Sequence, residues 1–275
     1  MLAEYVLRGL KAGVLAGLVF GLFVAIVANP LVAFADELGH GETAIEAGHE
    51  HDGSSGDGVV PSAVTNAVSV VSGVLWGILL GATVFGAGFY LLEPILPGGP
   101  RSVIPDSAMA AAGFLSVSGV PWLLLPPQPP GVQQFLAVST RIRLYAGLLL
   151  LGTVCCLLAL FVFDRLSRKR GRSTARAAIT ALLPFGLLAV PVVLAPANPI
   201  ENSLPPELSA GLVGMTVFGQ LLLWAVLASA HAWLRRGPSG ESLVEPNGST
   251  IEPDGSTAER SQTASTNVES AVSGD

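Results

Sequence analysis

Six long stretches without a charged residue constrain the fold of this chain more than any other feature. They cover residues 12–35, 58–92, 107–140, 144–163, 177–200 and 208–234. Each can hold about 20 apolar residues, the length of a helix that crosses roughly 30 Å of hydrocarbon. We therefore predict an all-α fold, a polytopic membrane helix bundle with six transmembrane helices. The second helix is expected at about 68–92 and the third at about 107–125, where a proline cluster ends it.

The composition argues against a soluble enzyme. Only 12% of the 275 residues are charged and mean hydropathy is +0.61, whereas soluble domains carry about 25% charged residues. The sequence contains no G-x-x-x-x-G-K-[ST] phosphate loop, no H-E-x-x-H and no G-x-S-x-G, which are common signatures of hydrolytic chemistry. We expect no enzymatic activity and no tightly bound cofactor.

The basic residues predict how the bundle is oriented. If the N-terminus is cytoplasmic, eleven Lys and Arg residues fall in inside segments, and only Arg141 and Arg143 fall in outside loops. Cytoplasmic loops carry such an excess. We therefore predict a multi-pass protein of the cell membrane with both termini in the cytoplasm.

The first helix has a second interpretation. Its apolar run ends in Ala33-Phe34-Ala35 before Asp36, which is similar to a signal-peptidase site. Cleavage there would leave five helices. The same helix carries glycines at every fourth position, as does the second helix, among them Gly13, Gly17, Gly77 and Gly81. Such ladders are typical of close helix packing, or they could line a pathway with exposed carbonyls.

The predicted outside loop at residues 36–63 is a candidate metal-binding segment. It contains three of the four histidines, seven carboxylate residues and no basic residue. Imidazole and carboxylate groups together suit divalent transition metals. The candidate ligands are His40, Glu42, His49, Glu50, His51 and Asp52. The alternative is a solvated acidic loop without a metal.

Two further sets of polar residues are candidates for a pathway. Thr216, Gln220, Trp224 and His231 share one face of the sixth helix, within about 80° of one another at 3.6 residues per turn. They would form interhelical hydrogen bonds or face a wet pathway. Arg141 opens the fourth helix at the outer side, where it would either snorkel to the interface or shape the outer mouth.

The C-terminal segment has a different composition. Residues 237–275 are rich in Ser, Gly and Thr, with seven carboxylate residues and one Arg, which predicts a disordered acidic tail in the cytoplasm. Residues 1–236 would form the membrane-embedded transporter domain. The acid-rich exposed segments, with 12 Arg and only 2 Lys in the chain, would suit a halophilic archaeon.

Several motifs resemble the CbtA family of predicted cobalt transporter subunits. The first is Val120-Pro121-Trp122-Leu123-Leu124-Leu125-Pro126-Pro127-Gln128-Pro129-Pro130-Gly131-Val132, which continues through Arg141 to Tyr145. The others are Leu204-Pro205 followed by Gln220-Leu221-Leu222-Leu223-Trp224, and Arg8-Gly9-Leu10 before a glycine-rich helix. The resemblance covers about 8–236. The family has Lys-Tyr where this chain has Leu124-Leu125, Asn where it has Gln128, and arginines that are absent around Gly211–Val213.

The resemblance implies a function in cobalt uptake, often linked to cobalamin synthesis, together with a small single-helix membrane subunit, CbtB. The family is described with five helices rather than six. We therefore expect a permease subunit for divalent transition metal ions, with cobalt(II) as the transported ion. The alternatives are a non-conducting membrane subunit that binds metal or supports another protein, and a transporter of a different substrate.

Overall fold

The computed structural model describes residues 1–46, 61–99, 102–128, 133–168, 173–196, 200–201 and 205–236. The chain divides into two compact units, Met1–Gly237 and Pro238–Asp275. The second unit, which contains nearly all of the predicted tail, lies outside the described residues. The fold below is that of the first unit.

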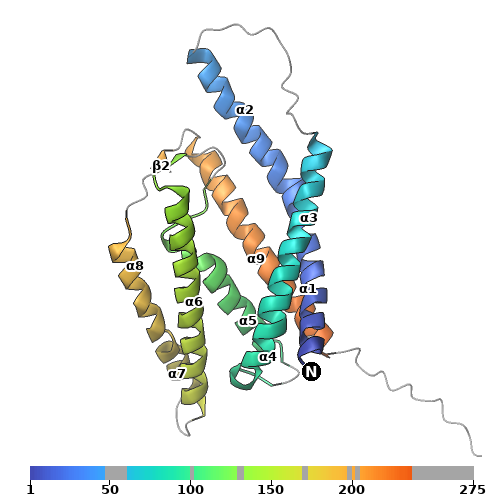
Figure 1. Cartoon of the computed structure of the whole chain (residues 1–275), viewed down its shortest axis with the longest axis vertical. Helices are drawn as coiled ribbons and strands as arrows, with labels where there is room; N and C mark the ends of the chain where they lie inside the picture. Colours follow the sequence, from blue (N-terminus) through green and yellow to red (C-terminus); the bar gives the residue numbers. More distant parts are fainter. Residues whose placement is uncertain are drawn as a thin grey trace, which may run out of the picture. The chain divides into compact units, whose positions relative to one another are not determined.

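Most of the first unit is helical, and several helices follow one another without a break (Figure 1). The first run comprises α1 (Leu2–Phe23), the π-helix η1 (Val24–Ala28) and α2 (Asn29–Glu46). The second comprises α3 (Ser62–Leu80), the π-helix η2 (Gly81–Gly88), α4 (Phe89–Leu92) and η3 (Glu93–Ile95). The third comprises α5 (Ile104–Phe114), η4 (Leu115–Gly119) and η5 (Pro121–Leu123).

The remaining elements complete the bundle. They are α6 (Val138–Ser167), then α7 (Thr174–Ala181), η6 (Leu183–Leu188) and α8 (Ala189–Leu194), and finally α9 (Pro206–Arg236). Two-residue strands β1 (Gln133–Gln134) and β2 (Ile200–Glu201) pair antiparallel, Gln133 opposite Glu201. This pairing ties the segment before α6 to the segment before α9.

The prediction of an all-α membrane bundle is confirmed. Among the described residues, five helices are long and apolar enough to span a membrane: Leu2–Glu37, Ser62–Ile95, Val138–Ser167, Thr174–Leu194 and Pro206–Arg236. The third predicted crossing is shorter. Its unbroken part, residues 104–119, is about 24 Å long at 1.5 Å per residue. After Val120, Pro121 starts a 3-10 turn, because proline cannot continue the hydrogen-bond ladder.

The loop predicted to begin at Asp36 does not begin there. Helix α2 continues through Glu46, so the first part of the predicted 36–63 loop is helical. No proline interrupts residues 31–46, and Ala, Leu and Glu, which favour helix, outnumber the two glycines that weaken it. The prediction of a loop over residues 36–46 was therefore wrong.

The glycine ladders form the contact between α1 and α3 with η2. A methyl group at Gly13 would lie 2.8 Å from the carbonyl carbon of Gly77, and closer still to its oxygen. Equivalent overlaps arise for Gly9 against Gly81, Gly17 against Gly73, and Gly21 against Val70. The two backbones are therefore in direct contact, and no pathway runs between these glycines.

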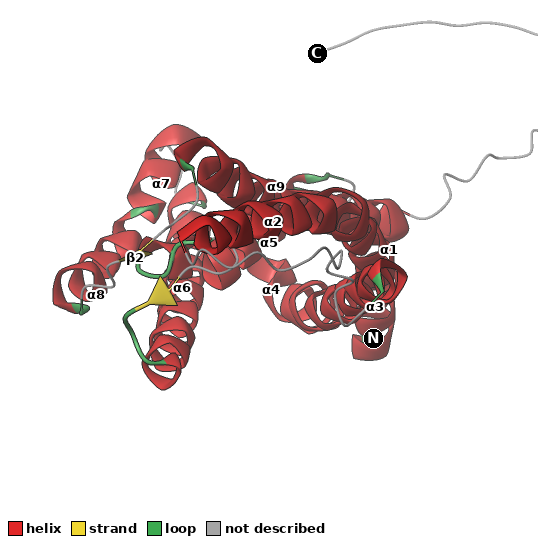
Figure 2. Cartoon of the chain, turned by 90° about the horizontal axis from the view of Figure 1, so that it is seen from above, coloured by secondary structure: helices red, strands yellow, loops and turns green. Residues whose placement is uncertain are grey.

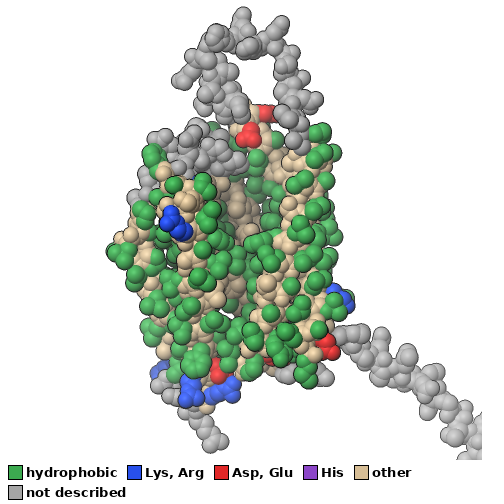
Figure 3. Space-filling model, viewed as in Figure 1, with side chains coloured by type: hydrophobic (Ala, Val, Ile, Leu, Met, Phe, Trp, Pro, Cys, Tyr) green, Lys and Arg blue, Asp and Glu red, His purple; other side chains and the backbone are tan. Residues whose placement is uncertain are grey.

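Helix α9 lies between two parts of the bundle (Figure 2). It packs against α1 on one side and against α5 on the other, while α6 packs against η4, α7 and η6. The core gathers around the α9 residues Leu223, Trp224 and Leu227, with Phe85 and Phe89 from η2 and α4. Outward-facing side chains are largely hydrophobic, as expected for a surface in lipid (Figure 3).

Candidate functional site

A polar face runs along α9; it is exposed at Thr216, half-buried at Gln220 and buried from Trp224 to His231. Thr216 and Gln220 lie in its first half, and Trp224 and His231 follow on the same side. Trp224 is 2% exposed and His231 is fully buried. Arg235, one turn beyond His231, continues this face to the end of the helix. Polar groups at membrane depth are costly unless they are bonded or serve a function.

The first half of this face borders a cavity of about 270 Å³ between α9 and the run from α1 to α2. Four polar residues line it: Asn29, Gln128, Thr216 and Gln220. The rest of the lining is apolar, with Phe20 and Phe23 opposite Gly219. The cavity is large enough for several waters or a partly hydrated ion, and hydroxyl and amide oxygens are suitable neighbours for either.

Hydrogen bonds hold the polar residues around this cavity in place. The Asn29 amide donates to Asn66 Oδ1 at 2.8 Å and to Ser69 Oγ at 3.0 Å. Ser118 Oγ donates to Gln220 Oε1 at 3.4 Å. The Thr216 hydroxyl donates to the Leu212 carbonyl at 3.0 Å. The cavity wall is built from α1, η1, α2 and α9 together with Gln128. Residues of α3 and η4 stand behind this wall and hydrogen-bond to its polar side chains.

The middle of the α9 face is closed by Trp224. Its ring lies on Gly113 of α5, where a methyl group would overlap the six-membered ring. The indole Nε1 is buried and has no hydrogen-bond partner within the described part of the chain. The glycine thus lets a large aromatic side chain fit between two helices, beyond the end of the cavity.

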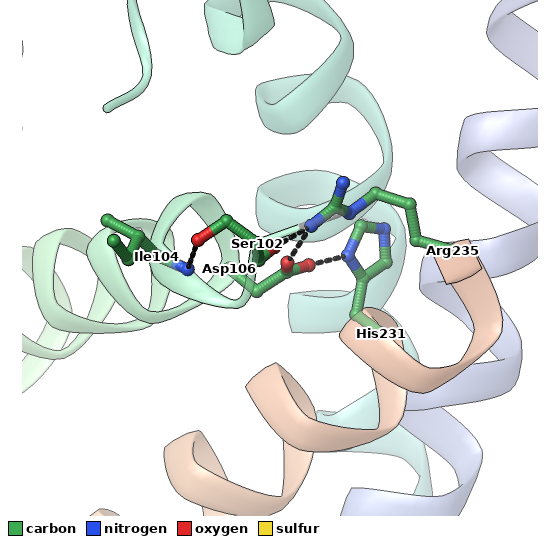
Figure 4. Close-up of polar contacts among 5 residues, drawn as sticks. All are labelled: Ser102, Ile104, Asp106, His231 and Arg235. Atoms are coloured by element: carbon green, nitrogen blue, oxygen red, sulfur yellow. Dashed lines mark hydrogen bonds and ion pairs between the residues drawn. The ribbon is translucent and has the colours of Figure 1, made fainter. Parts of the chain in front are cut away.

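A buried charged cluster occupies the other end of the face (Figure 4). Asp106, in the first turn of α5, is 1% exposed. Its Oδ1 lies 2.6 Å from His231 Nδ1, and its Oδ2 accepts from Arg235 Nη2 at 2.7 Å. The same Arg235 nitrogen also donates to the Ser102 carbonyl. We call these three residues, Asp106, His231 and Arg235, the Asp–His–Arg cluster.

Aromatic rings surround the Asp–His–Arg cluster. The rings of Phe85 and Phe89 lie 5.2 and 4.8 Å from the His231 ring, centroid to centroid. The Arg235 guanidinium lies over Phe89 at 5.7 Å. A charge pair buried this deeply is retained when its members are well bonded, and the aromatic faces favour cations beside them.

Sequence reasoning missed Asp106 and Arg235. Asp106 borders an uncharged stretch and has the ordinary position of an acid in a first helical turn. Arg235 could have been found, because it lies four residues after His231 and so on the same face. The pairing with Asp106 had no signal in the sequence, since the residues are 129 positions apart.

The predicted metal ligands fall largely outside what the structure describes. His49, Glu50, His51 and Asp52 lie outside the described residues, and His40 and Glu42 lie in α2 at positions whose side chains are not described. Among the described residues, no group of three or more His, Cys, Asp or Glu side chains could hold a metal. A metal site in this segment stays a prediction.

Arg141 lies in the first turn of α6 and borders a groove. The groove, about 540 Å³, is lined by Arg141, Gln128, Tyr145 and apolar residues. Arg141 Nε is buried without a hydrogen-bond partner in the described ranges. The Tyr145 hydroxyl donates to the Val117 carbonyl at 2.8 Å. Gln128 borders both this groove and the cavity, so Arg141 is near the polar half of the α9 face.

Comparison with known proteins identifies the family to which this chain belongs. We found no match among curated proteins and none among solved structures. A family model described as probable cobalt transporter subunit (CbtA) matches residues 2–236. That range holds every described helix from α1 to α9. The chain therefore belongs to the CbtA family of probable cobalt transporter subunits.

Proposed function

We propose that this chain is the membrane-spanning permease subunit of an uptake system for divalent transition metal ions, with cobalt(II) as its cargo. One observation carries the proposal: the polar face of α9 borders a cavity between helices, and four polar side chains line this cavity. A bundle that served only as an anchor would not need a polar cavity at this depth.

The cavity is suited to the passage of an ion. Thr216, Gln220 and Asn29 contribute oxygen atoms from two helix runs, and neutral oxygens can replace part of a hydration shell without holding the ion tightly. A site that carried carboxylates and histidines at this point would bind a transition metal too strongly to release it quickly. Neutral ligands in the cavity would therefore let the ion pass through and would not retain it.

We propose that residues 36–63 capture the ion. His40, His49 and His51, with Glu42, Glu50 and Asp52, would collect the metal at the outer side and raise its local concentration. Imidazole and carboxylate ligands are shared by cobalt, nickel and zinc, so selectivity depends on the complete donor set. Arg141 would help to shape the outer mouth beside this segment.

The driving force would come from the membrane potential, worth about 2.3 kcal/mol per charge per 100 mV. A divalent ion gains twice that amount on entering a negative interior. The family consists of subunits, which implies a partner. We propose a small single-helix membrane protein similar to CbtB as that partner.

Uptake into liposomes tests the proposal. The purified chain would be reconstituted alone and with the small partner subunit, with an interior-negative potential and external cobalt(II), nickel(II) or zinc(II). We expect saturable cobalt entry that the other two ions inhibit less effectively than cobalt itself. The combined replacement His40→Ala, His49→Ala and His51→Ala should raise the cobalt concentration for half-maximal uptake.

A variant on the exposed side of α9 serves as the control for uptake. Ser229→Ala changes a hydroxyl that bonds to the Ala225 carbonyl on the exposed side of α9, and it should leave uptake unchanged. If cobalt enters no faster than into empty liposomes, with and without the partner, the chain is not a permease. Cobalt binding without entry would then indicate a non-conducting metal-binding subunit.

A further inference from the structure

The groove beside the start of α6 contains a cation whose charge is not balanced within the described part of the chain. Arg141 lines this groove and is half-buried. No ion pair joins its guanidinium to a carboxylate of the described residues, and its buried Nε has no hydrogen-bond partner among them. A half-buried cation has lost part of its hydration, so an anion beside it is stabilising.

The start of α6 adds to the positive potential at this place. Ala137 precedes the helix and provides no side-chain cap for the first N–H groups, and the first turn contains no acidic residue. The positive end of the helix dipole therefore lies in the same turn as Arg141, where a basic side chain is the unfavourable choice. One anion at this position would interact favourably with both the guanidinium and the helix end.

The position of Arg141 along α6 places it at the level of lipid headgroups. The uncharged stretch 144–163 lies within α6 and is about 30 Å long at 1.5 Å per residue, which matches the hydrocarbon core of a bilayer. Arg141 precedes this stretch by three residues, or about 4.5 Å. Headgroups occupy that layer on either side of the membrane, so the argument holds for both orientations of the bundle.

The other residues of the groove suit a lipid better than a soluble anion. Val138 and Ile142 line it and are 61% and 63% exposed. Leu125 and Pro126, from the segment after η5, add further apolar surface. The groove, about 540 Å³, thus combines one cation with apolar side chains that acyl chains can cover. A free phosphate would contact only the cation, whereas a phospholipid contacts both.

We propose that this groove binds an anionic phospholipid, with the lipid phosphate at the Arg141 guanidinium and an acyl chain along Val138 and Ile142. The bound lipid neutralises Arg141 and joins α6 to the segment after η5. The inference concerns lipid binding alone and goes beyond the proposed function, because a chain that moves no cobalt can still hold a lipid in this groove.

Lipid binding measured without transport tests the proposal. The full chain in a neutral detergent would be titrated with phosphatidylglycerol, which carries one negative charge, or with zwitterionic phosphatidylcholine, and bound lipid would be counted by native mass spectrometry. The wild type should prefer phosphatidylglycerol by about fivefold or more, the contribution of one basic residue near anionic lipid. Arg141→Gln should lower this preference below about twofold. Arg141→Lys should retain part of it, because lysine keeps the charge without the planar fork.

Arg143→Gln is the matched control. Arg143 lies two positions further along α6, about 200° around the helix from Arg141. It is exposed, and its Nε donates to the Ser139 carbonyl. The control should keep the wild-type preference for phosphatidylglycerol. If Arg143→Gln loses as much of the preference as Arg141→Gln, general attraction to the basic end of α6 explains the binding, and the proposed site is wrong.

Thermal unfolding of the same proteins gives a second measurement. Phosphatidylglycerol should raise the unfolding midpoint of the wild type and of Arg143→Gln more than that of Arg141→Gln, because a ligand stabilises the state that binds it. Equal binding of both lipids by the wild type would overturn the proposal and indicate that a carboxylate, such as one from residues 36–63, already neutralises Arg141. Displacement of the lipid by millimolar inorganic phosphate would also overturn it and identify a free anion as the ligand.

Discussion

Helix contacts of two opposite kinds lie side by side in this bundle. The contact of α1 with α3 and η2 is made by backbones, with glycine facing glycine and no space for a methyl group. The contacts of α9 with its neighbours are made by side chains. They include a cavity, an indole nitrogen without a partner among the described residues, and the buried Asp–His–Arg cluster.

The difference separates a contact that leaves no space between backbones from one that leaves a cavity. Dispersion contacts between glycine faces have one close-packed arrangement. The polar face of α9 instead borders a cavity, so it is not close-packed along its whole length. We infer that α1 and α3 form the fixed frame of the subunit and that α5 and α9 form its working interface.

The largest effect should come from filling the glycine contact. Gly13→Leu would place a branched side chain where even a Cβ meets the Gly77 carbonyl group, so the two helices must separate along most of their length. We expect little folded protein after purification in detergent, as judged by size-exclusion chromatography and thermal unfolding.

The control is the same substitution, glycine to leucine, in α9 and outside the glycine contact. At Gly214 of α9, a Cβ would meet no other atom within 4 Å, and leucine favours helix over glycine by roughly 0.5–1 kcal/mol. Gly214→Leu should therefore fold as well as the wild type. Equal stability of the two variants would refute the idea of a close-packed frame.

The second effect concerns the buried charges. Asp106→Asn removes the carboxylate that pairs with His231 and with Arg235, whose side chain is 9% exposed. Breaking such a pair typically costs about 3–5 kcal/mol, so the midpoint of thermal unfolding in detergent should fall clearly. Asp164→Asn, which breaks a pair with the 65% exposed Arg168, should cost about 0–1 kcal/mol. A larger loss in Asp164→Asn would contradict this contrast.

The smallest effects on stability should come from the cavity, where transport is affected instead. Gln220→Leu removes an amide from the cavity wall and should slow cobalt uptake about tenfold, equivalent to about 1.4 kcal/mol in the barrier. Thr216→Val keeps the shape and removes one hydroxyl, so a loss of roughly threefold is expected, within the range of one neutral hydrogen bond. Unchanged uptake in both variants would exclude the cavity from the pathway.

Much of the fold was predictable because the membrane imposes simple rules. Uncharged stretches located the helices, and the glycine spacing identified the two helices that approach closely. Thr216, Gln220, Trp224 and His231 could be placed on one face because the helical period is fixed. The third crossing was harder to predict, since Pro121 ends its helix early, and the extension of α2 to Glu46 depended on weak local preferences.

The sequence by itself determined what is local and periodic: the number of apolar runs, the polar face of α9 and the family motifs. Only the tertiary structure decided which residues meet across the bundle. Asp106 joins His231 and Arg235 because α5 and α9 pack antiparallel, and Gly113 admits Trp224 between them. Such contacts depend on the packing of distant segments, and no periodicity within a single helix specifies them.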